Sequence, residues 1–236
     1  MQSNPFDKLT DRYDAWYDSD EGSEIFAIEV TCLQELVAER PGKWLEVGVG
    51  TGRFGKALGI VDGLDPSLPM LGLAAARGIR GVAGRGESLP YLDSCFDGVL
   101  LIATICFLHD PTRALSECAR VLRKDGSLIV GMVPCDSSWG RFYQRKGREG
   151  HPFYAIAKFY SCGEVIQMAG RAGFVLDEAI SCLFGAPGEA GEQIGGSRSG
   201  LVPNAGFVAL RFSLREKARA GSSDNQHPAR GKLHPP

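Results

Sequence analysis

The chain has 236 residues, 44% of them hydrophobic, and a formal net charge of −2. A chain of this size and composition can bury one sizeable core, and its charge gives no general attraction to nucleic acid or anionic lipid. The seven cysteines are scattered without a Cys-x-x-Cys pair, which argues against a zinc site and a disulfide framework. Because no apolar run resembles a signal or membrane-spanning segment, we expect a cytoplasmic protein.

The first part of the chain, residues 1–42, is predicted to form a helical cap. Tyr13, Trp16 and Tyr17 fall on one face of a helix at this spacing. That face either packs on the core, as periodic aromatic residues usually do, or closes as a lid over a ligand, and the two interpretations are compatible. A second helix is expected over residues 24–39, ended by Pro41 and Gly42.

The stretch from Lys43 to Leu58 is the most informative part of the sequence. It reads Lys-Trp-Leu-Glu-Val-Gly-Val-Gly-Thr-Gly-Arg-Phe-Gly-Lys-Ala-Leu, an apolar run that breaks into glycines and resumes at helical spacing. This pattern predicts a strand, a tight turn at Gly48, Gly50 and Gly52, and the start of a helix. A turn without side chains lets a ligand lie against the backbone, so we expect a small ligand here.

Strands and helices alternate through the rest of the chain. We predict strands over 60–64, 78–83, 96–107, 127–133, 174–184 and 206–213, and helices over 66–77, 111–122 and 161–172. Lys124-Asp125-Gly126 is expected to close the helix 111–122. The alternation predicts an α/β fold, a Rossmann-like doubly wound sheet that is mostly parallel with a C-terminal antiparallel strand. The glycine turn, Asp65 and the loop after Gly84 should then gather at the edge where ligands bind.

Two segments interrupt this alternation. The connection over residues 134–160 is long and rich in aromatic residues, and we interpret it as a substrate-side insertion. The segment 185–203 is rich in Gly, Pro and Ser, which favours a flexible loop. We therefore predict a single domain over residues 1–213, followed by a tail, 214–236, whose lack of an apolar pattern favours disorder.

The glycine turn is compatible with two kinds of ligand. Residues 50–55 match Gly-x-Gly-x-x-Gly, the dinucleotide fingerprint, so a nicotinamide-dependent oxidoreductase is one alternative. However, Glu46 stands just before the glycines, where it would repel a pyrophosphate, and Asp65 follows sooner than the ribose-binding acid of that fingerprint. A ligand with an ammonium at one end and a ribose at the other suits both acids, and S-adenosylmethionine is such a molecule.

Several motifs in the same order resemble those of class I S-adenosylmethionine-dependent methyltransferases, in the small group that contains the ubiquinone and menaquinone C-methyltransferases. Glu46-Val-Gly-Val-Gly-Thr-Gly52 is similar to motif I, and Gly63-Leu-Asp-Pro-Ser67 to the segment that follows it. The other similar motifs are Gly86-Glu-Ser-Leu-Pro-Tyr91, Phe96-Asp97, Arg120-Val-Leu122 and, in the cap, Tyr13-Asp-Ala-Trp-Tyr17.

The resemblance implies S-adenosylmethionine as the cofactor. Glu46 and the backbone of Gly48, Gly50 and Gly52 would hold its methionine part, and Asp65 would accept hydrogen bonds from its ribose hydroxyls. Glu87 would border the adenine, and Tyr17 of the cap would complete the cofactor site. Tyr13, Trp16 and Tyr143 would contact the acceptor.

The resemblance also implies methyl transfer to a small-molecule acceptor by in-line displacement, in which the protein mainly aligns donor and acceptor. A base is needed only if the acceptor must lose a proton. His109 is the best-placed candidate, although a histidine beside Asp110-Pro111 is as easily a turn residue. A nicotinamide-dependent oxidoreductase and a catalytically silent S-adenosylmethionine-binding module stay open as alternatives. We expect no nucleic-acid partner and no metal.

Overall fold

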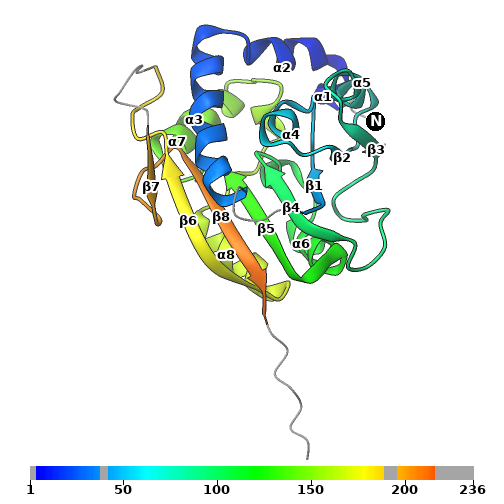
Figure 1. Cartoon of the computed structure of the whole chain (residues 1–236). Helices are drawn as coiled ribbons and strands as arrows, with labels where there is room; N and C mark the ends of the chain where they lie inside the picture. The colour runs from blue at the N-terminus through cyan, green and yellow to red at the C-terminus, as the bar shows by residue number, and fades with distance from the viewer. Residues whose placement is uncertain (1–3, 38–41, 189–195, 216–236) are drawn as a thin grey trace, which may run out of the picture.

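A computed structural model describes residues 4–37, 42–188 and 196–215, and within these ranges the strands form one sheet of eight, in the order β3-β2-β1-β4-β5-β8-β6-β7 (Figure 1). The parallel part comprises β1 (Trp44–Val47), β2 (Asp62–Asp65), β3 (Arg80–Ala83), β4 (Phe96–Ile102) and β5 (Leu122–Met132). The antiparallel neighbours follow in β8 (Phe207–Leu214), β6 (Phe174–Cys182) and β7 (Ser197–Ser199). The predicted fold class is confirmed, and β7 is an antiparallel edge that the sequence did not predict.

Helices cover both faces of the sheet (Figure 1). On one face lie α3 (Asp20–Val37) and α4 (Arg53–Leu58), and on the other lie α6 (Pro111–Val121) and α8 (Cys162–Arg171). Helix α5 (Leu68–Ala76) packs on β3. Ser161 caps α8 in a capping box with Glu164, because the side chain of each accepts a backbone N–H of the other.

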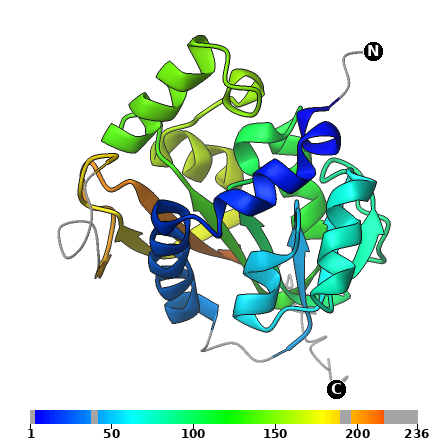
Figure 2. The same cartoon turned by 90° about the horizontal axis from the view of Figure 1, so that it is seen from above.

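Two short helices, α1 (Pro5–Lys8) and α2 (Thr10–Trp16), cross above the carboxyl ends of the parallel strands, as the view from above shows (Figure 2). They form the predicted cap together with α3, which begins at Asp20 instead of Glu24. The segment 134–160, for which a substrate-side role stays a prediction, contains a helix that the sequence did not predict, α7 (Ser138–Arg148), and a 3₁₀ turn, η2 (Tyr154–Ile156). Ser137 caps α7 by accepting a hydrogen bond from the backbone of Gly140.

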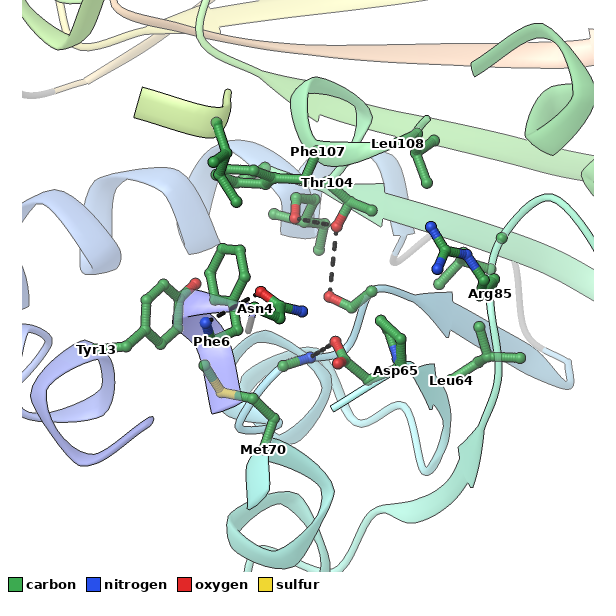
Figure 3. Close-up of a pocket in the computed structure, with 18 of the residues that line it drawn as sticks. Asn4, Phe6, Tyr13, Leu64, Asp65, Met70, Arg85, Thr104, Phe107 and Leu108 are labelled. Carbon is green, nitrogen blue, oxygen red and sulfur yellow. Dashed lines mark hydrogen bonds between the residues drawn. The ribbon is translucent and has the colours of Figure 1, made fainter. Parts of the chain in front are cut away.

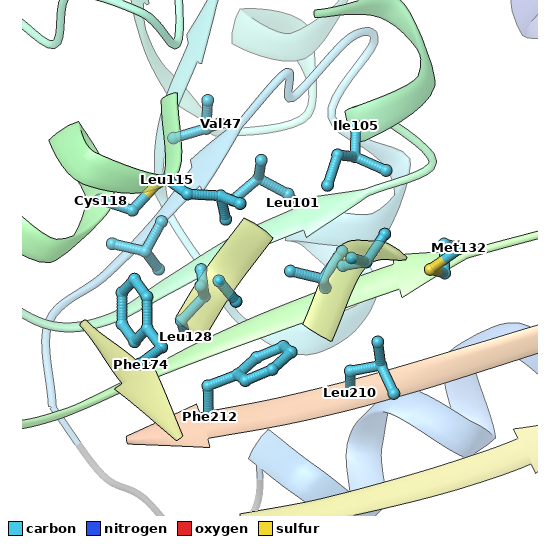
Figure 4. Close-up of a cluster of buried hydrophobic side chains, with 14 of the residues drawn as sticks. Val47, Leu101, Ile105, Leu115, Cys118, Leu128, Met132, Phe174, Leu210 and Phe212 are labelled. Carbon is cyan, nitrogen blue, oxygen red and sulfur yellow. The ribbon is translucent and has the colours of Figure 1, made fainter. Parts of the chain in front are cut away.

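Apolar side chains fill both sides of the sheet. Between the sheet and helices α6 and α8, the fully buried Leu115, Leu128, Phe174 and Phe212 belong to one cluster (Figure 4). On the opposite side a second cluster joins the inner face of α3 to the sheet and to Trp139 of α7. These two layers make the strands rigid, and they fix the positions of the loops at the strand ends.

Two predicted boundaries are wrong for physical reasons. The turn expected at residues 124–126 is part of β5, which starts at Leu122 directly after α6, and the pairing with β4 shifts register between Phe96 and Gly98. This irregularity leaves Arg123, Lys124 and Asp125 exposed inside a strand. Because three consecutive polar residues before a glycine are typical of a turn, the sequence predicted a turn here. The strand expected over 96–107 ends at Ile102, because the chain turns at Ala103, whose φ is 50°, into the 3₁₀ turn η1 (Ile105–Phe107).

Of the predicted tail, residues 216–236 lie outside the described residues, as does part of the predicted loop 185–203. Among the helices of the described ranges, none has the length and apolar character needed to cross a membrane.

Candidate functional site

A cavity lies at the carboxyl ends of β1, β2 and β4, next to the point where the strand order reverses. Its volume is about 410 Å³, and Figure 3 shows the residues around it. The glycine turn, Asp65 and the loop after Gly84 all line it, so the predicted gathering of these three segments is confirmed. Its other lining residues include Phe6, Tyr13, Met70, Thr104, Phe107 and Leu108.

The glycines of the turn serve different purposes. Gly48 has a φ of 78°, and a Cβ on it would lie 2.4 Å from the side chain of Thr104, so glycine is needed for β1 and β4 to approach each other. Gly50 has a φ of 53°, and a Cβ there would meet no atom within 4 Å. Gly50 therefore leaves open space beside bare backbone in the cavity wall. Gly52 precedes α4 and does not belong to the cavity lining among the described residues.

Asp65 joins the tip of β2 to the glycine turn. Its Oδ2 accepts a hydrogen bond from the backbone N–H of Gly50 at 2.9 Å, and its Oδ1 accepts one from Ser67 at 2.9 Å. Burial raises the pKa of this carboxyl, and the two backbone hydrogen bonds act in the opposite direction. Because each carboxylate oxygen has a further lone pair, Asp65 can still accept hydrogen bonds from a ligand hydroxyl.

Glu46 lies behind the turn rather than in the cavity wall. Its neighbour Val47 faces the cavity, whereas Glu46 points to the other side of β1, towards Gly55 of α4. The residue is 2% exposed, and its Oε2 is buried with no hydrogen-bond partner among the described residues. Burial raises the pKa of Glu46 to about 8, against the effect of a backbone hydrogen bond from Gly55, and the charge of Asp65 raises it further.

One end of the cavity is formed by Arg85, Gly86 and Glu87. The Oε1 of Glu87 accepts hydrogen bonds from the backbone N–H groups of His109 at 2.8 Å and Asp110 at 3.2 Å. Glu87 therefore fixes the loop that follows β4. The side chain of His109 is exposed, and His109 is not among the described residues that line the cavity.

The other end is aromatic and comes from the cap. The ring of Phe6 lies 5.0 Å from that of Phe107 and 5.7 Å from that of Tyr13, between centroids. Tyr13 lines the cavity, and its hydroxyl is 3.1 Å from that of Tyr17, which is buried behind it. The cap therefore packs on the core through Tyr17 and lines the cavity through Tyr13, and its role as a lid stays a prediction. Trp16 and Tyr143 do not line this cavity within the described ranges, although Trp16 packs against Tyr17.

An ion-pair cluster fastens the cap to the helices that follow β1 and β2. Asp14 of α2 pairs with the guanidinium of Arg53 on α4 at 2.9 Å and with that of Arg77 after α5 at 2.7 Å. Arg77 also donates to the carbonyl of Thr51 at 2.9 Å. Burial opposes ionisation of Asp14, but hydrogen bonds that include those from Arg53 and Arg77 outweigh it and hold its pKa far below the usual range. The sequence offered no signal for Asp14, which is one acid among many in the cap.

Thr104 and Phe107 were also missed by sequence reasoning. Thr104 Oγ1 donates to the carbonyl oxygen of Ile102 at 2.9 Å, and it lies 3.4 Å from that of Gly48. Both residues line the cavity because β4 ends early. Both residues lie within the apolar run 96–107, which we predicted to be one strand, so the sequence did not place them in the loop after β4.

Comparisons with known proteins agree with this geometry. A family model described as a methyltransferase domain matches residues 45–130. An uncharacterized protein of Mycobacterium tuberculosis is 38% identical over 198 residues, which are 84% of this chain and 70% of that protein. A demethylmenaquinone methyltransferase of Thermotoga maritima is 33% identical over 105 residues, 41% of this chain and 46% of the enzyme.

A solved structure from Thermotoga maritima resembles the whole fold. It is described as a SAM-dependent methyltransferase and possible histamine N-methyltransferase, is 35% identical, and has a TM-score of 0.82 over 88% of this chain and 97% of that chain. The segment matched by the family model contains the glycine turn, Asp65, Glu87 and Thr104. The protein therefore belongs to the class I S-adenosylmethionine-dependent methyltransferases, as its sequence motifs predicted.

Proposed function

We propose that the protein transfers a methyl group from S-adenosylmethionine to a small-molecule acceptor by in-line displacement. The observation that carries this proposal is one cavity with a bare glycine wall and Asp65 on one side and the rings of Phe6 and Tyr13 on the other. Its volume, about 410 Å³, falls within the range of small-molecule sites. Histamine, the possible acceptor named for the Thermotoga protein, is a small molecule, and an acceptor of similar size would suit this cavity.

The residues of the cavity suit this cofactor. The open side of Gly50 leaves backbone for the methionine part, and Asp65 has lone pairs left for the ribose hydroxyls. We assign the end formed by Arg85 and Glu87 to the adenine. Glu46 would meet the ammonium from behind the turn, because its unpartnered Oε2 is buried outside the cavity wall. The positive charge of the bound ammonium would lower the raised pKa of Glu46 and favour its ionised form.

When bound, S-adenosylmethionine supplies a methyl group that its sulfonium charge already activates. The chain then has to align the acceptor and exclude water. Phe6, Tyr13 and Phe107 close the aromatic end of the cavity, and Asp14 holds the cap in place through Arg53. We assign no catalytic role to the exposed side chain of His109.

Thermal unfolding with added ligands tests the cofactor. S-adenosylmethionine and S-adenosylhomocysteine should each raise the melting temperature, because a ligand that binds only the folded state stabilises it. Oxidised and reduced nicotinamide cofactors should not. The reverse pattern would support the oxidoreductase alternative and contradict the proposal.

Transfer of a labelled methyl group tests catalysis. With amine, hydroxyl and quinone-like acceptors, we expect a labelled product from at least one class. Binding of S-adenosylhomocysteine without product on any acceptor would support the catalytically silent alternative.

A further inference from the structure

A half-buried carboxylate without a partner lies beside the buried residues of α3. Glu29 comes four residues after Ile25 and four before Leu33, which are 3% and 0% exposed, so the three side chains share one helix face. Within the described part of the chain, Glu29 makes no hydrogen bond and no ion pair. An acid in this apolar stripe is costly unless something neutralises it.

Four tyrosines from two other parts of the chain lie close enough to this carboxylate for its charge to act on their hydroxyls. Tyr13 and Tyr17 belong to the cap, with their hydroxyls 3.1 Å apart, and Tyr143 of α7 and Tyr154 of η2 have ring centroids 4.5 Å apart. Tyr13, Tyr17 and Tyr143 pack in the same apolar cluster as the inner face of α3. Burial raises the pKa of all four hydroxyls, and the charge of Glu29 raises each of them further.

Tyr13 connects this group to the cofactor cavity. It lines that cavity at the end opposite Arg85, as Figure 3 shows. The charge of Asp65 also contributes to the raised pKa of Tyr13, after burial and the hydrogen bond with Tyr17. The tyrosines and Glu29 therefore lie next to the aromatic end of the cavity. Tyr13 stands between them and the glycine turn.

We infer that the methyl acceptor is a small cationic amine, which the tyrosine rings hold with its ammonium on Glu29. This inference rests on the proposed function. Aromatic faces attract cations, and an ammonium donates charge-assisted hydrogen bonds to a carboxylate. Such a ligand would be the positively charged partner of Glu29, because none of the described residues is one.

The same carboxylate can take the proton that blocks transfer. The ammonium gives one proton to Glu29, and the freed lone pair of nitrogen forms a bond to the methyl carbon. The carbon–sulfur bond breaks, and its electron pair stays on sulfur. The products are the methylated ammonium and S-adenosylhomocysteine, and the proton on Glu29 then leaves to water.

The titration of Glu29 agrees with this role. Burial raises its pKa to about 8, which suits a base that works near neutral pH. The titratable groups whose pKa the charge of Glu29 raises are the four tyrosines and the thiol of Cys182 on β6. His151 stacks on Tyr154 at 4.4 Å, and burial, Lys146 and Arg12 lower its pKa. His151 is therefore the competing base that an experiment has to separate from Glu29.

Binding of choline, in the presence of S-adenosylhomocysteine, measures cation recognition without turnover. We expect choline to bind more tightly than the uncharged alcohol in which carbon replaces its nitrogen, and Glu29→Gln to remove this preference. Glu21→Gln, which removes the same charge from an exposed position of α3, should keep it. S-adenosylhomocysteine should bind all three proteins equally.

Methyl transfer to phenethylamine and tyramine, compared with their alcohol counterparts, measures the chemistry. We expect transfer to the amines, and a kcat/KM that is lower by at least about 100-fold in Glu29→Gln but unchanged in Glu21→Gln. His151→Gln should keep most of the activity.

Three results would overturn the inference while leaving the proposed function intact, provided that S-adenosylhomocysteine binds. They are equal binding of choline and its uncharged counterpart, transfer only to acceptors without an amine, and loss of activity in His151→Gln but not in Glu29→Gln. If S-adenosylhomocysteine does not bind the wild-type protein, the proposed function itself fails.

Discussion

The two halves of the site are built in different ways. The proposed cofactor half, from Gly48 to Asp65, is made mostly of backbone, and Asp65 holds it through two backbone N–H groups. The proposed acceptor half is made of side chains from α2, α3, α7 and η2, including Glu29 and Tyr154, which lie far apart in the sequence. The cofactor half is therefore specified locally, whereas the acceptor half exists only when the tertiary structure has formed.

The connection between the halves is electrostatic. Asp14 and Arg53 are 14% and 16% exposed at the side chain, and their pair joins the acceptor-side cap to the helix after the glycine turn. A pair this far from water is screened less than a surface pair. Changes in the cofactor half should thus act on the backbone and on cofactor binding, and changes in this connection should act on cap closure.

The largest effect is expected at Gly48. Gly48→Ala places a Cβ against Thr104 at a φ of 78°, so strain and overlap together should cost about 3 kcal/mol of folding free energy. Gly59→Ala is the matched control, because its φ is 72° but a Cβ there meets no atom within 4 Å. Thermal unfolding should show a clearly smaller loss for Gly59→Ala. Equal losses would mean that the approach of β4 does not constrain the turn.

The next effect concerns Asp65. Asp65→Ala removes the acceptor of two backbone N–H groups and of the proposed ribose contact, so affinity for S-adenosylhomocysteine should fall by about 100-fold. Asp62→Asn changes the same strand at its other end, where Asp62 pairs with the exposed Arg80, and should leave affinity unchanged. Calorimetric titration compares the affinities of the two variants for S-adenosylhomocysteine. Similar affinities would show that Asp65 does not contact the cofactor.

A smaller effect is expected for the connection between the halves. Asp14→Asn weakens the pairs with Arg53 and Arg77, and S-adenosylhomocysteine should dissociate about 10-fold faster because the cap opens more often. Asp18→Asn removes a partner of the same Arg53, but that carboxylate is 67% exposed, so its effect should be slight. Stopped-flow dissociation rates distinguish the two, and equal rates would show that Asp14 does not control closure.

The last prediction concerns the pH dependence of stability. Burial raises the pKa of Glu46 from 4.5 to about 8, so between these values the folded state holds a proton that the unfolded state has lost. Stability should therefore fall as pH rises across this window. Glu46→Gln should flatten the fall without abolishing it, because burial raises the pKa of Glu29 to about 8 as well. A slope unchanged in Glu46→Gln would show that Glu46 titrates normally.

The same contrast explains what the sequence could predict. The alternation of strands and helices, the glycine turn and the place of Asp65 all follow from local patterns, and the structure brings them together as expected. Thr104 and Phe107 could not be placed, because the end of β4 depends on a turn at Ala103 that no local pattern marks. Glu29 reads as an ordinary helical acid because the tyrosines on which its charge acts come from distant parts of the chain. Asp14 is one of several acids until the tertiary structure pairs it with Arg53 and Arg77.

Steady-state kinetics of methyl transfer, with cofactor and amine varied separately, tests most directly whether the two halves divide the work. Asp65→Ala should raise the KM for S-adenosylmethionine and leave that for the amine nearly unchanged, and Glu29→Gln should lower kcat and raise the KM for the amine alone. This division is what the account predicts. Both substitutions raising the KM of the same substrate, or Glu29→Gln changing only the KM for the cofactor, would contradict it.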